Sequence, residues 1–278
     1  MLIDTHSHLN FNAYNNDLED VIKRSLDNDI WMINVGSQYS TCQKAIEISQ
    51  KYSQGVYAAV GLHPIHLETN LVKIKEDMEE AQQFQAKGEV FDYDKYKSLA
   101  KNEKVKAIGE VGLDYYYKPK TTARKKIFKE KQREVLIQEI SLARELDLPV
   151  IFHCRMAHQD LLEILKVQLS KFNLKGVIHC FTGNWQEAEK YLEMGFFLGF
   201  NGIIFKLNLD EIIKKTPLDK ILIETDCPYL TPPAMGTKRN EPVYIKYVAE
   251  KIAQLKNLKL EEMAEKTTDN AKELFAIQ

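Results

Sequence analysis

Two histidines stand two residues apart near the start of a chain that holds only seven histidines in all. His6 and His8 follow a short apolar run that begins at Leu2. In an extended strand, side chains at this spacing point to the same face. The two imidazoles can therefore bind one metal ion, and this pair is the first candidate for chemistry in the sequence.

Four more side chains that can bind metals lie at or just after the ends of other short apolar runs: Glu110, His153, His179 and Asp226. Imidazole and carboxylate ligands without thiolate suit zinc, manganese or, with fewer histidines, magnesium. Together with the first pair they are too many for one tetrahedral ion, and they fit two ions that share a bridging carboxylate or hydroxide. We therefore predict a cofactor of two divalent metal ions, Mg²⁺, Mn²⁺ or Zn²⁺.

Each of these residues has a simpler explanation when it is taken alone. A single histidine at a strand end is more often a hydrogen-bonded polar residue than a ligand, and an acid before a helix is often an N-cap. Their joint placement at strand ends favours the metal site. Three cysteines directly follow proposed ligands: Cys154, Cys180 and Cys227. Because neighbours in a strand point to opposite faces, we expect these thiols to pack into the wall of the fold.

The elements that would position these residues alternate along the chain. Short apolar runs are typical of β-strands at Leu2–Thr5, Trp31–Val35, Val56–Val60, Val105–Ile108, Pro149–His153, Gly176–Cys180, Phe196–Phe200 and Ile221–Glu224. Helical patterns separate or follow them at Leu18–Asp27, Cys42–Ser53, Phe128–Leu146, His158–Leu169, Gln186–Met194, Leu209–Lys214, Tyr244–Leu255 and Glu261–Phe275. The alternation predicts parallel βαβ units of the α/β class that close into a (β/α)₈ TIM barrel, in which all strands end at one face.

An open doubly wound sheet is the competing architecture. It usually carries a Gly-rich phosphate loop after an early strand, and this sequence has none. We treat residues 1–278 as one domain because no Ser/Gly/Pro-rich linker divides the chain. The connection Glu68–Asn102 is long for one link between strands, and its Lys-, Glu- and Gln-rich composition predicts a helical insert between the third and fourth strands.

Composition narrows the class of protein. The net charge of −2 argues against a protein that coats nucleic acid through a global positive field. The four cysteines stand far apart and indicate neither a disulfide framework nor a zinc ribbon. No segment has the pattern of a signal peptide or approaches the roughly 18 apolar residues of a membrane span. We expect a cytoplasmic protein with no membrane association, and nothing in the sequence indicates an oligomeric state.

Ordered motifs across almost the whole chain resemble the TatD family of metal-dependent deoxyribonucleases, within the wider amidohydrolase-like barrels. They are Asp-Thr-His-Ser-His-Leu (4–9), Gly-Leu-His-Pro (61–64), Gly-Glu-Val-Gly-Leu-Asp-Tyr (109–115), His-Cys-Arg (153–155), His-Cys-Phe-Thr-Gly (179–183), Glu-Thr-Asp-Cys-Pro (224–228) and Arg-Asn-Glu-Pro (239–242). The resemblance implies one ion on His6, His8, Glu110 and Asp226 and a second ion on Glu110, His153 and His179, with Glu110 as the bridge. It also implies a DNA substrate, since family members commonly act as 3′→5′ exonucleases on single strands.

In such a site, a water acidified by the ions attacks the phosphorus. Asp226 is placed to accept the proton of that water, and Glu110 bridges the ions. Glu224 lies two residues before Asp226, on the same face of an extended segment, and is a candidate to orient the water or a ligand.

Four further residues are candidates for substrate binding: His63, Asp114, Arg155 and Arg239. His63 has an equal claim as a cap for the following turn, and we expect Asp114 to orient a ligand or a binding group. Arg155 shares the face of His153 and suits a bidentate phosphate contact, with a structural salt bridge as the alternative. Asn240 is expected to brace its loop. The basic stretch Lys118–Lys126, beside several tyrosines, is either a track for single-stranded nucleic acid or a solvated helix start.

Two other functions compete with a deoxyribonuclease. A small-molecule amidohydrolase or esterase on the same barrel often bridges its ions with a carbamylated lysine at the fourth strand, where this chain has Glu110. A catalytically inactive metal-binding barrel is the other alternative, and the presence of all six candidate ligands argues against it. The sequence therefore predicts a metal-dependent hydrolase of phosphodiester bonds.

Overall fold

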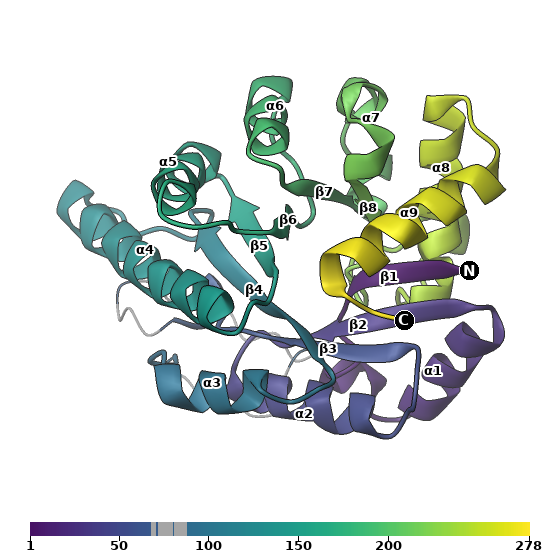
Figure 1. Cartoon of the computed structure of the whole chain (residues 1–278), viewed down its shortest axis with the longest axis horizontal. Coiled ribbons are helices and arrows are strands. Elements are labelled where there is room, and N and C mark those ends of the chain that lie inside the picture. The colour runs from purple at the N-terminus through teal and green to yellow at the C-terminus, as the bar shows by residue number, and fades with distance from the viewer. Residues whose placement is uncertain (68–70, 72–79, 81–87) are drawn as a thin grey trace.

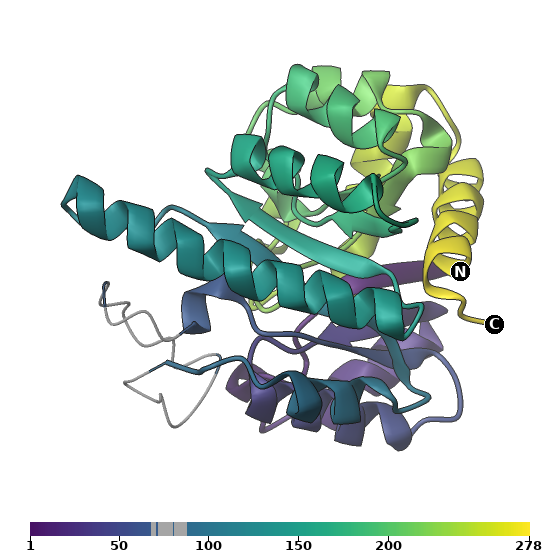
Figure 2. The ribbon, with the colours of Figure 1, turned by 60° about the vertical axis from the view of Figure 1, so that its left-hand side comes forward.

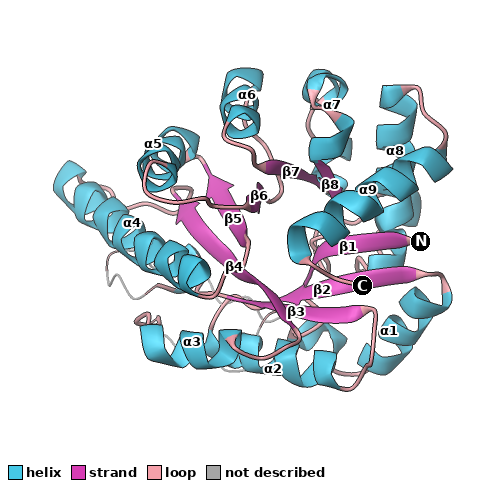
Figure 3. Cartoon of the chain, viewed as in Figure 1, coloured by secondary structure: helices cyan, strands magenta, loops and turns pink. Residues whose placement is uncertain are grey.

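Eight parallel strands form one sheet in chain order in the computed structural model, which describes residues 1–67, 71, 80 and 88–278. The strands are β1 (Leu2–Ser7), β2 (Ile30–Val35), β3 (Val56–Val60), β4 (Val105–Asp114), β5 (Val150–Arg155), β6 (Gly176–Ile178), β7 (Phe197–Phe200) and β8 (Ile221–Ile223). Each pairs in parallel with the next. Helices surround the strands (Figure 3). The predicted α/β barrel is confirmed.

The first and last strands meet where the barrel closes. Ser7 forms an isolated parallel bridge with Cys227. The amide of Asp226 donates to the carbonyl of His6 at 2.8 Å, and the amide of His8 donates to the carbonyl of Cys227 at 2.9 Å. The closure therefore brings three predicted ligands together at the carboxyl ends of β1 and β8.

The helices lie outside the strands (Figure 1). They are α1 (Leu18–Asp27), α2 (Tyr39–Gln50), α3 (Tyr93–Ala100), α4 (Thr122–Glu145), α5 (His158–Leu169), α6 (Trp185–Glu193), α7 (Asp210–Lys215), α8 (Ile245–Lys256) and α9 (Leu260–Phe275). Figure 2 shows the 24 residues of α4 running along the outside of the sheet. Within the described residues, no helix combines the length and the apolar character that a membrane crossing requires.

Apolar side chains pack in two layers, one inside the ring of strands and one between the strands and the helices. In β5, Ile151 belongs to the inner cluster, whereas Phe152 belongs to the outer one. The last turn of α9 adds Phe275 to the inner cluster. Because side chains alternate along a strand, His153 shares the inner face with Ile151. The same alternation places Cys154 with the outer cluster.

The predicted bounds of α1 and α5 match the structure, and those of several other elements differ. β4 continues to Asp114, well beyond its predicted end at Ile108. α4 begins at Thr122, earlier than predicted, because the side chain of Thr121 caps the helix by accepting from the amide of Arg124. Of the predicted insert at 68–102, α3 is a helix, while residues 68–70, 72–79 and 81–87 lie outside the described residues.

Gly112 allows β4 to lie close to β5 beside the site. Its φ is +152°, and a Cβ atom at this position would lie 1.9 Å from the carbonyl oxygen of His153. Any other residue would push the two strands apart. The close packing of β4 on β5 therefore requires the second glycine of the Gly-Glu-Val-Gly motif.

Candidate metal centre

The two histidines at the end of β1 point their ring nitrogens at one place. The Nε2 atoms of His6 and His8 lie 3.1 Å apart, and both side chains are buried. Nδ1 of His8 donates to the backbone carbonyl of Val35 at 2.8 Å. Because Nδ1 carries the proton, the neutral ring keeps a lone pair on Nε2 for a metal ion. Two nitrogen lone pairs at this distance repel each other unless a cation or a proton lies between them.

Two carboxylate oxygens face the same nitrogens. Oε2 of Glu110 lies 3.4 Å from Nε2 of His6 and 3.9 Å from Nε2 of His8. Oδ1 of Asp226 lies 3.4 Å from Nε2 of His8 and 3.9 Å from Nε2 of His6. Ligands about 2.1 Å from one ion in tetrahedral geometry are roughly 3.4 Å from one another. The four atoms therefore have the spacing of a shell around one ion.

The other oxygen of Glu110 faces a different set of histidines. Oε1 lies 2.7 Å from Nδ1 of His153, 3.4 Å from Nε2 of His63 and 3.7 Å from Nε2 of His179. His63, Glu110 and His153 offer ligand atoms within 4.8 Å of one another, as do His6, His8 and Glu110. Glu110 thus presents one carboxylate oxygen to each set.

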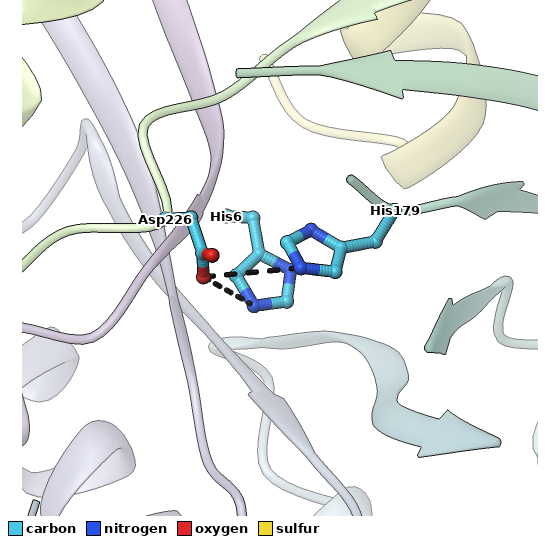
Figure 4. A group of neighbouring side chains, drawn as sticks. All are labelled: His6, His179 and Asp226. Atoms are coloured by element: carbon cyan, nitrogen blue, oxygen red, sulfur yellow. Dashed lines mark ion pairs between the residues drawn. The ribbon is translucent and has the colours of Figure 1, made fainter. Parts of the chain in front are cut away.

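His179 links the two sets. Its ring stacks on that of His6 with 3.5 Å between centroids, and both rings face the carboxylate of Asp226 (Figure 4). Nε2 of His179 lies 3.8 Å from Oδ1 of Asp226. His6, His179 and Asp226 form a third group whose ligand atoms lie within 4.8 Å of one another.

Glu224 lies behind His179. Its Oε1 is 2.9 Å from Nδ1 of His179, and it accepts from the amide of Cys180 at 2.7 Å and from Nδ2 of Asn201 at 3.1 Å. Glu224 is fully buried and is absent from the wall of the cavity described below. Of its two predicted roles, the orientation of a ligand fits this position, and contact with the attacking water does not.

Asp114 makes the corresponding contact with His153. Its Oδ2 lies 3.1 Å from Nε2 of His153. Gln132 of α4 holds Asp114 by accepting from its amide at 2.9 Å and donating to its carbonyl at 3.0 Å. Asp114 therefore orients a candidate ligand, as expected, and it also lines the cavity.

The charges of the site are set by burial and by these contacts. Burial, helped by nearby His179, lowers the pKa of His6 to about 4, so its ring is neutral at pH 7. Burial also opposes protonation of His153 and His179, but contacts with carboxylates raise their pKa values to about 9 and about 10. Although burial raises the pKa values of Glu110 and Asp226, the surrounding histidines bring them below their ordinary values. Without metal, His153 and His179 therefore carry protons at the place where metal ions would bind.

His63 differs from His8 in where it carries its proton. Its Nδ1 accepts from the amide of Ile65 at 3.0 Å and caps the short turn Pro64–His66. Burial lowers the pKa of His63, so the ring is neutral, with its proton on Nε2. Nε2 faces Oε1 of Glu110 as a hydrogen-bond donor. His63 therefore has the position of both predicted roles, the cap and the donor near the substrate, and it lacks the free lone pair of a metal ligand.

The candidate ligands open onto a cavity of about 630 Å³. This volume lies within the range of roughly 300–1,000 Å³ that is typical of ligand sites. Its wall contains five of the six predicted metal ligands and three of the four predicted substrate contacts: His8, Glu110, His153, His179 and Asp226, with His63, Asp114 and Arg155. One open chamber thus collects nearly all the predicted residues.

Arg239 is the predicted substrate contact that the structure does not bring to the cavity. Its guanidinium donates to both carboxylate oxygens of Asp17, at 2.9 and 2.6 Å, and lies 4.1 Å from the ring centre of Tyr14. It also pairs with Glu241 at 3.3 Å. Through these contacts of its two terminal nitrogens, Arg239 ties the loop after β8 to the segment before α1. The structure thus places Arg239 in ion pairs outside the cavity wall, and its contact with substrate stays a prediction.

Asn240 and Asp4 hold the loop that carries Asp226. Nδ2 of Asn240 donates to the carbonyls of Thr225 and Tyr229, at 3.0 and 2.6 Å, as the predicted brace requires. On the other side, the buried carboxyl group of Asp4, whose pKa burial raises to about 8, accepts from the amide of Thr225 at 2.9 Å and from its hydroxyl at 2.5 Å. Asp4 is not among the site residues predicted from the sequence. Its spacing of two residues from His6 is the signal that would have placed it on the same face.

The cysteine prediction is right at two positions and wrong at one. Cys154 and Cys227 are buried in the wall, as expected. Cys154 and Cys180 both belong to the cavity wall, but Cys180 is only partly buried. It follows the end of β6 and has a left-handed φ of 45°, so the alternation of a strand does not apply to it. The basic stretch Lys118–Lys126 lies on the loop before α4 and its first turn, outside the cavity wall, and its role stays a prediction.

The chain is similar in sequence and in fold to known proteins. The family model described as TatD related DNase matches residues 3–276. An uncharacterized metal-dependent hydrolase of Bacillus subtilis, YabD, is 41% identical and covers 100% of both chains. The 3′-5′ ssDNA/RNA exonuclease TatD of Shigella flexneri is 30% identical, with 99% of each chain covered. Among solved structures, the TatD homolog YJJV of Escherichia coli matches with a TM-score of 0.81 at 26% identity, covering 100% of this chain and 98% of that one.

Proposed function

The chain belongs to the TatD related DNase family, and we propose that it uses two divalent metal ions to remove nucleotides from the 3′ end of single-stranded DNA. The family supports hydrolysis of DNA. The name of the Shigella flexneri relative supports a 3′-5′ exonuclease on single strands, and that name includes RNA as well.

The two oxygens of Glu110 are the observation that carries the two-ion proposal. Oε2 faces His6 and His8, and Oε1 faces His153 and His179. In the proposed centre, the first ion binds His6, His8, Glu110 and Asp226, and the second ion binds Glu110, His153 and His179. Glu110 would thus supply one carboxylate oxygen to each ion.

Each group of the site has a distinct task in the proposed reaction. When bound, the ions supply Lewis acidity that polarises the phosphodiester and makes a nucleophilic water available at neutral pH. Asp226 is ionised and its side chain is 16% exposed, more than that of Glu110, so it is suited to accept the proton from that water. Nε2 of His63 donates a hydrogen bond to a phosphate oxygen, which stabilises charge that develops there.

Two residues position ligands without touching the substrate phosphorus. Glu224 keeps Nε2 of His179 directed into the site through the 2.9 Å contact at Nδ1. Asp114 does the same for His153 from the side of the cavity. Contacts of this kind fix the orientation of the ring and raise its basicity.

An exonuclease assay tests the proposal. With Mg²⁺ or Mn²⁺, the protein should shorten a 5′-labelled single-stranded oligonucleotide from its 3′ end, and EDTA should stop the reaction. Glu110→Gln should remove nearly all activity. Glu139→Gln is the matched control, because Glu139 is a buried carboxyl of α4 outside the cavity wall, and burial raises its pKa. A protein that leaves every DNA and RNA substrate intact but hydrolyses an amide or lactone would refute the nuclease assignment and favour a small-molecule amidohydrolase.

A further inference from the structure

Exposed aromatic and apolar side chains gather at the mouth of the cavity. In the described part of the chain, nine large apolar side chains are exposed, and four of them line this cavity: Tyr116, Tyr117, Met156 and Leu207. Their exposed fractions are 50%, 38%, 63% and 45%. An apolar group of this size around one opening is typical of a binding site.

Tyr116 and Arg155 pack against each other in this rim. The guanidinium of Arg155 lies 3.7 Å from the ring centre of Tyr116, and Tyr117 packs edge-on against Tyr116 with 4.9 Å between ring centres. Among the described residues, no carboxylate forms an ion pair with Arg155. The predicted salt-bridge alternative for Arg155 is therefore absent there, and its charge and flat face remain available to a ligand.

The backbone fixes this pair close to the candidate metal ligands. The amide of Tyr116 donates to Oδ1 of Asp114 at 2.8 Å, and Oδ2 of the same carboxylate contacts His153. The amide of Tyr115 donates to the carbonyl of Arg155 at 2.9 Å. Arg155 thus lies two residues beyond the candidate ligand His153 and pairs with Asp114 in the β4–β5 register, and Tyr116 follows Asp114 by two residues.

We propose that Tyr116 and Arg155 form a stacking site for an unpaired nucleobase next to the scissile phosphate. This proposal rests on the proposed nuclease function and adds a base-binding subsite to it. Aromatic rings and guanidinium planes stack on any base, so the subsite shows little sequence preference. A base inside a duplex is already stacked and paired, so the subsite favours a single-stranded or frayed end.

The base, rather than the phosphate, is the part of the substrate that this rim matches. A phosphate alone needs charge and hydrogen-bond donors, which a guanidinium supplies without any aromatic neighbour. The rim also offers flat and apolar surface that a phosphate does not use. This surface comes from the Tyr116 ring that packs on Arg155, from the exposed Tyr117 and from Met156. Apolar surface of this kind lowers the free energy of a stacked base.

Three variants separate stacking from charge and from folding. Tyr116→Leu removes the ring and keeps apolar volume, Tyr116→Phe keeps the ring, and Arg155→Lys keeps the charge without the plane. Tyr247→Leu is the control, because Tyr247 also lies beside a cation, Lys246 at 5.1 Å, but stands on α8 outside the cavity.

The first readout is the KM for two single-stranded oligonucleotides that differ only in whether the 3′-terminal nucleotide carries a base. Tyr116→Leu should raise the KM for the base-bearing strand on the order of tenfold more than the KM for the abasic strand. Arg155→Lys should do the same to a smaller extent, and Tyr116→Phe and Tyr247→Leu should leave the ratio of the two KM values unchanged. An equal change for both strands, or no change, overturns the proposal.

The second readout does not depend on turnover. An oligonucleotide with 2-aminopurine at its 3′-terminal or penultimate position should lose fluorescence when it binds the wild-type protein, and lose less on Tyr116→Leu. If the wild type cleaves no phosphodiester, including bis(4-nitrophenyl) phosphate, the proposed function fails, while quenching that depends on Tyr116 still supports the base site. Equal quenching by wild type and Tyr116→Leu, or none by either, overturns the stacking site.

Discussion

Replacing Glu224 by glutamine tests how a residue that never reaches the cavity sets the metal centre. Oε1 of Glu224 makes the 2.9 Å contact with Nδ1 of His179 and accepts from the amides of Cys180 and Asn201. Glu224→Gln keeps an acceptor for these amides and removes the negative charge beside the ring. Loss of such a partner typically costs about 10–100-fold in metal affinity. That range equals about 1.4–2.8 kcal/mol.

The loss of metal affinity should affect only one of the two ions. His179 belongs to the proposed second set, so titration of the metal-free protein with Mn²⁺ should show the second binding step weakened and the first nearly unchanged. Melting temperature should change little in Glu224→Gln. In Glu224→Ala it should fall clearly, because two buried amides then lose their acceptor at about 1–3 kcal/mol each.

A control variant and two possible outcomes decide whether Glu224 tunes the metal centre. Glu139→Gln, which changes a buried carboxyl that accepts from the amide of Leu62 at 2.9 Å, controls for the loss of a buried acid. If Glu224→Gln binds both ions as the wild type does, the contact with His179 does not tune the centre. If both steps weaken equally, the assignment of His179 to the second ion is wrong.

Four further predictions concern protons, the β8 loop and the barrel closure. The pKa values of His153 and His179 lie near 9 and 10 without metal, so an ion that binds these rings must displace their protons. Calorimetry should therefore show a metal affinity that rises with pH, by up to about a hundredfold per pH unit below pH 9. These pKa values exceed the unfolded value of about 6.5, so the stabilisation that they give the metal-free protein is complete below pH 6.5 and should be lost by about pH 10 in denaturant titrations. Arg239→Met should lower the unfolding free energy by about 1–2 kcal/mol through loss of the Asp17 contacts, and the KM for DNA should stay within about twofold; a large rise in KM would restore Arg239 to the substrate site. Asp4→Asn should lower the affinity for the first ion more than the affinity for the second. An equal loss of affinity for both ions would mean that Asp4 serves folding alone.

Periodicity was enough to predict the barrel and to group the candidate ligands. Each strand alternates between an inner and an outer face, so His153 could be placed with Ile151 and apart from Phe152 before any contact was known. Since all strands of a parallel barrel end at the same face, residues as distant in the chain as His6 and Asp226 could be expected to meet.

The remaining features depend on contacts that a linear pattern does not contain. Arg239 has the residue type of a phosphate contact, but its partner Asp17 lies 222 positions away. Cys180 follows a strand that ends two residues earlier, so the alternation no longer holds. The stacking of Arg155 on Tyr116 depends on the β4–β5 register, which pairs Asp114 with Arg155.

Diffraction from crystals grown with Mn²⁺ tests the two-ion centre most directly. Anomalous difference maps should contain two peaks about 3.5–4 Å apart. One should lie against Oε2 of Glu110, His6 and His8, and the other against Oε1 of Glu110, with His153 and His179. A single peak at saturating Mn²⁺, or two peaks that do not share Glu110, would contradict the bridged centre.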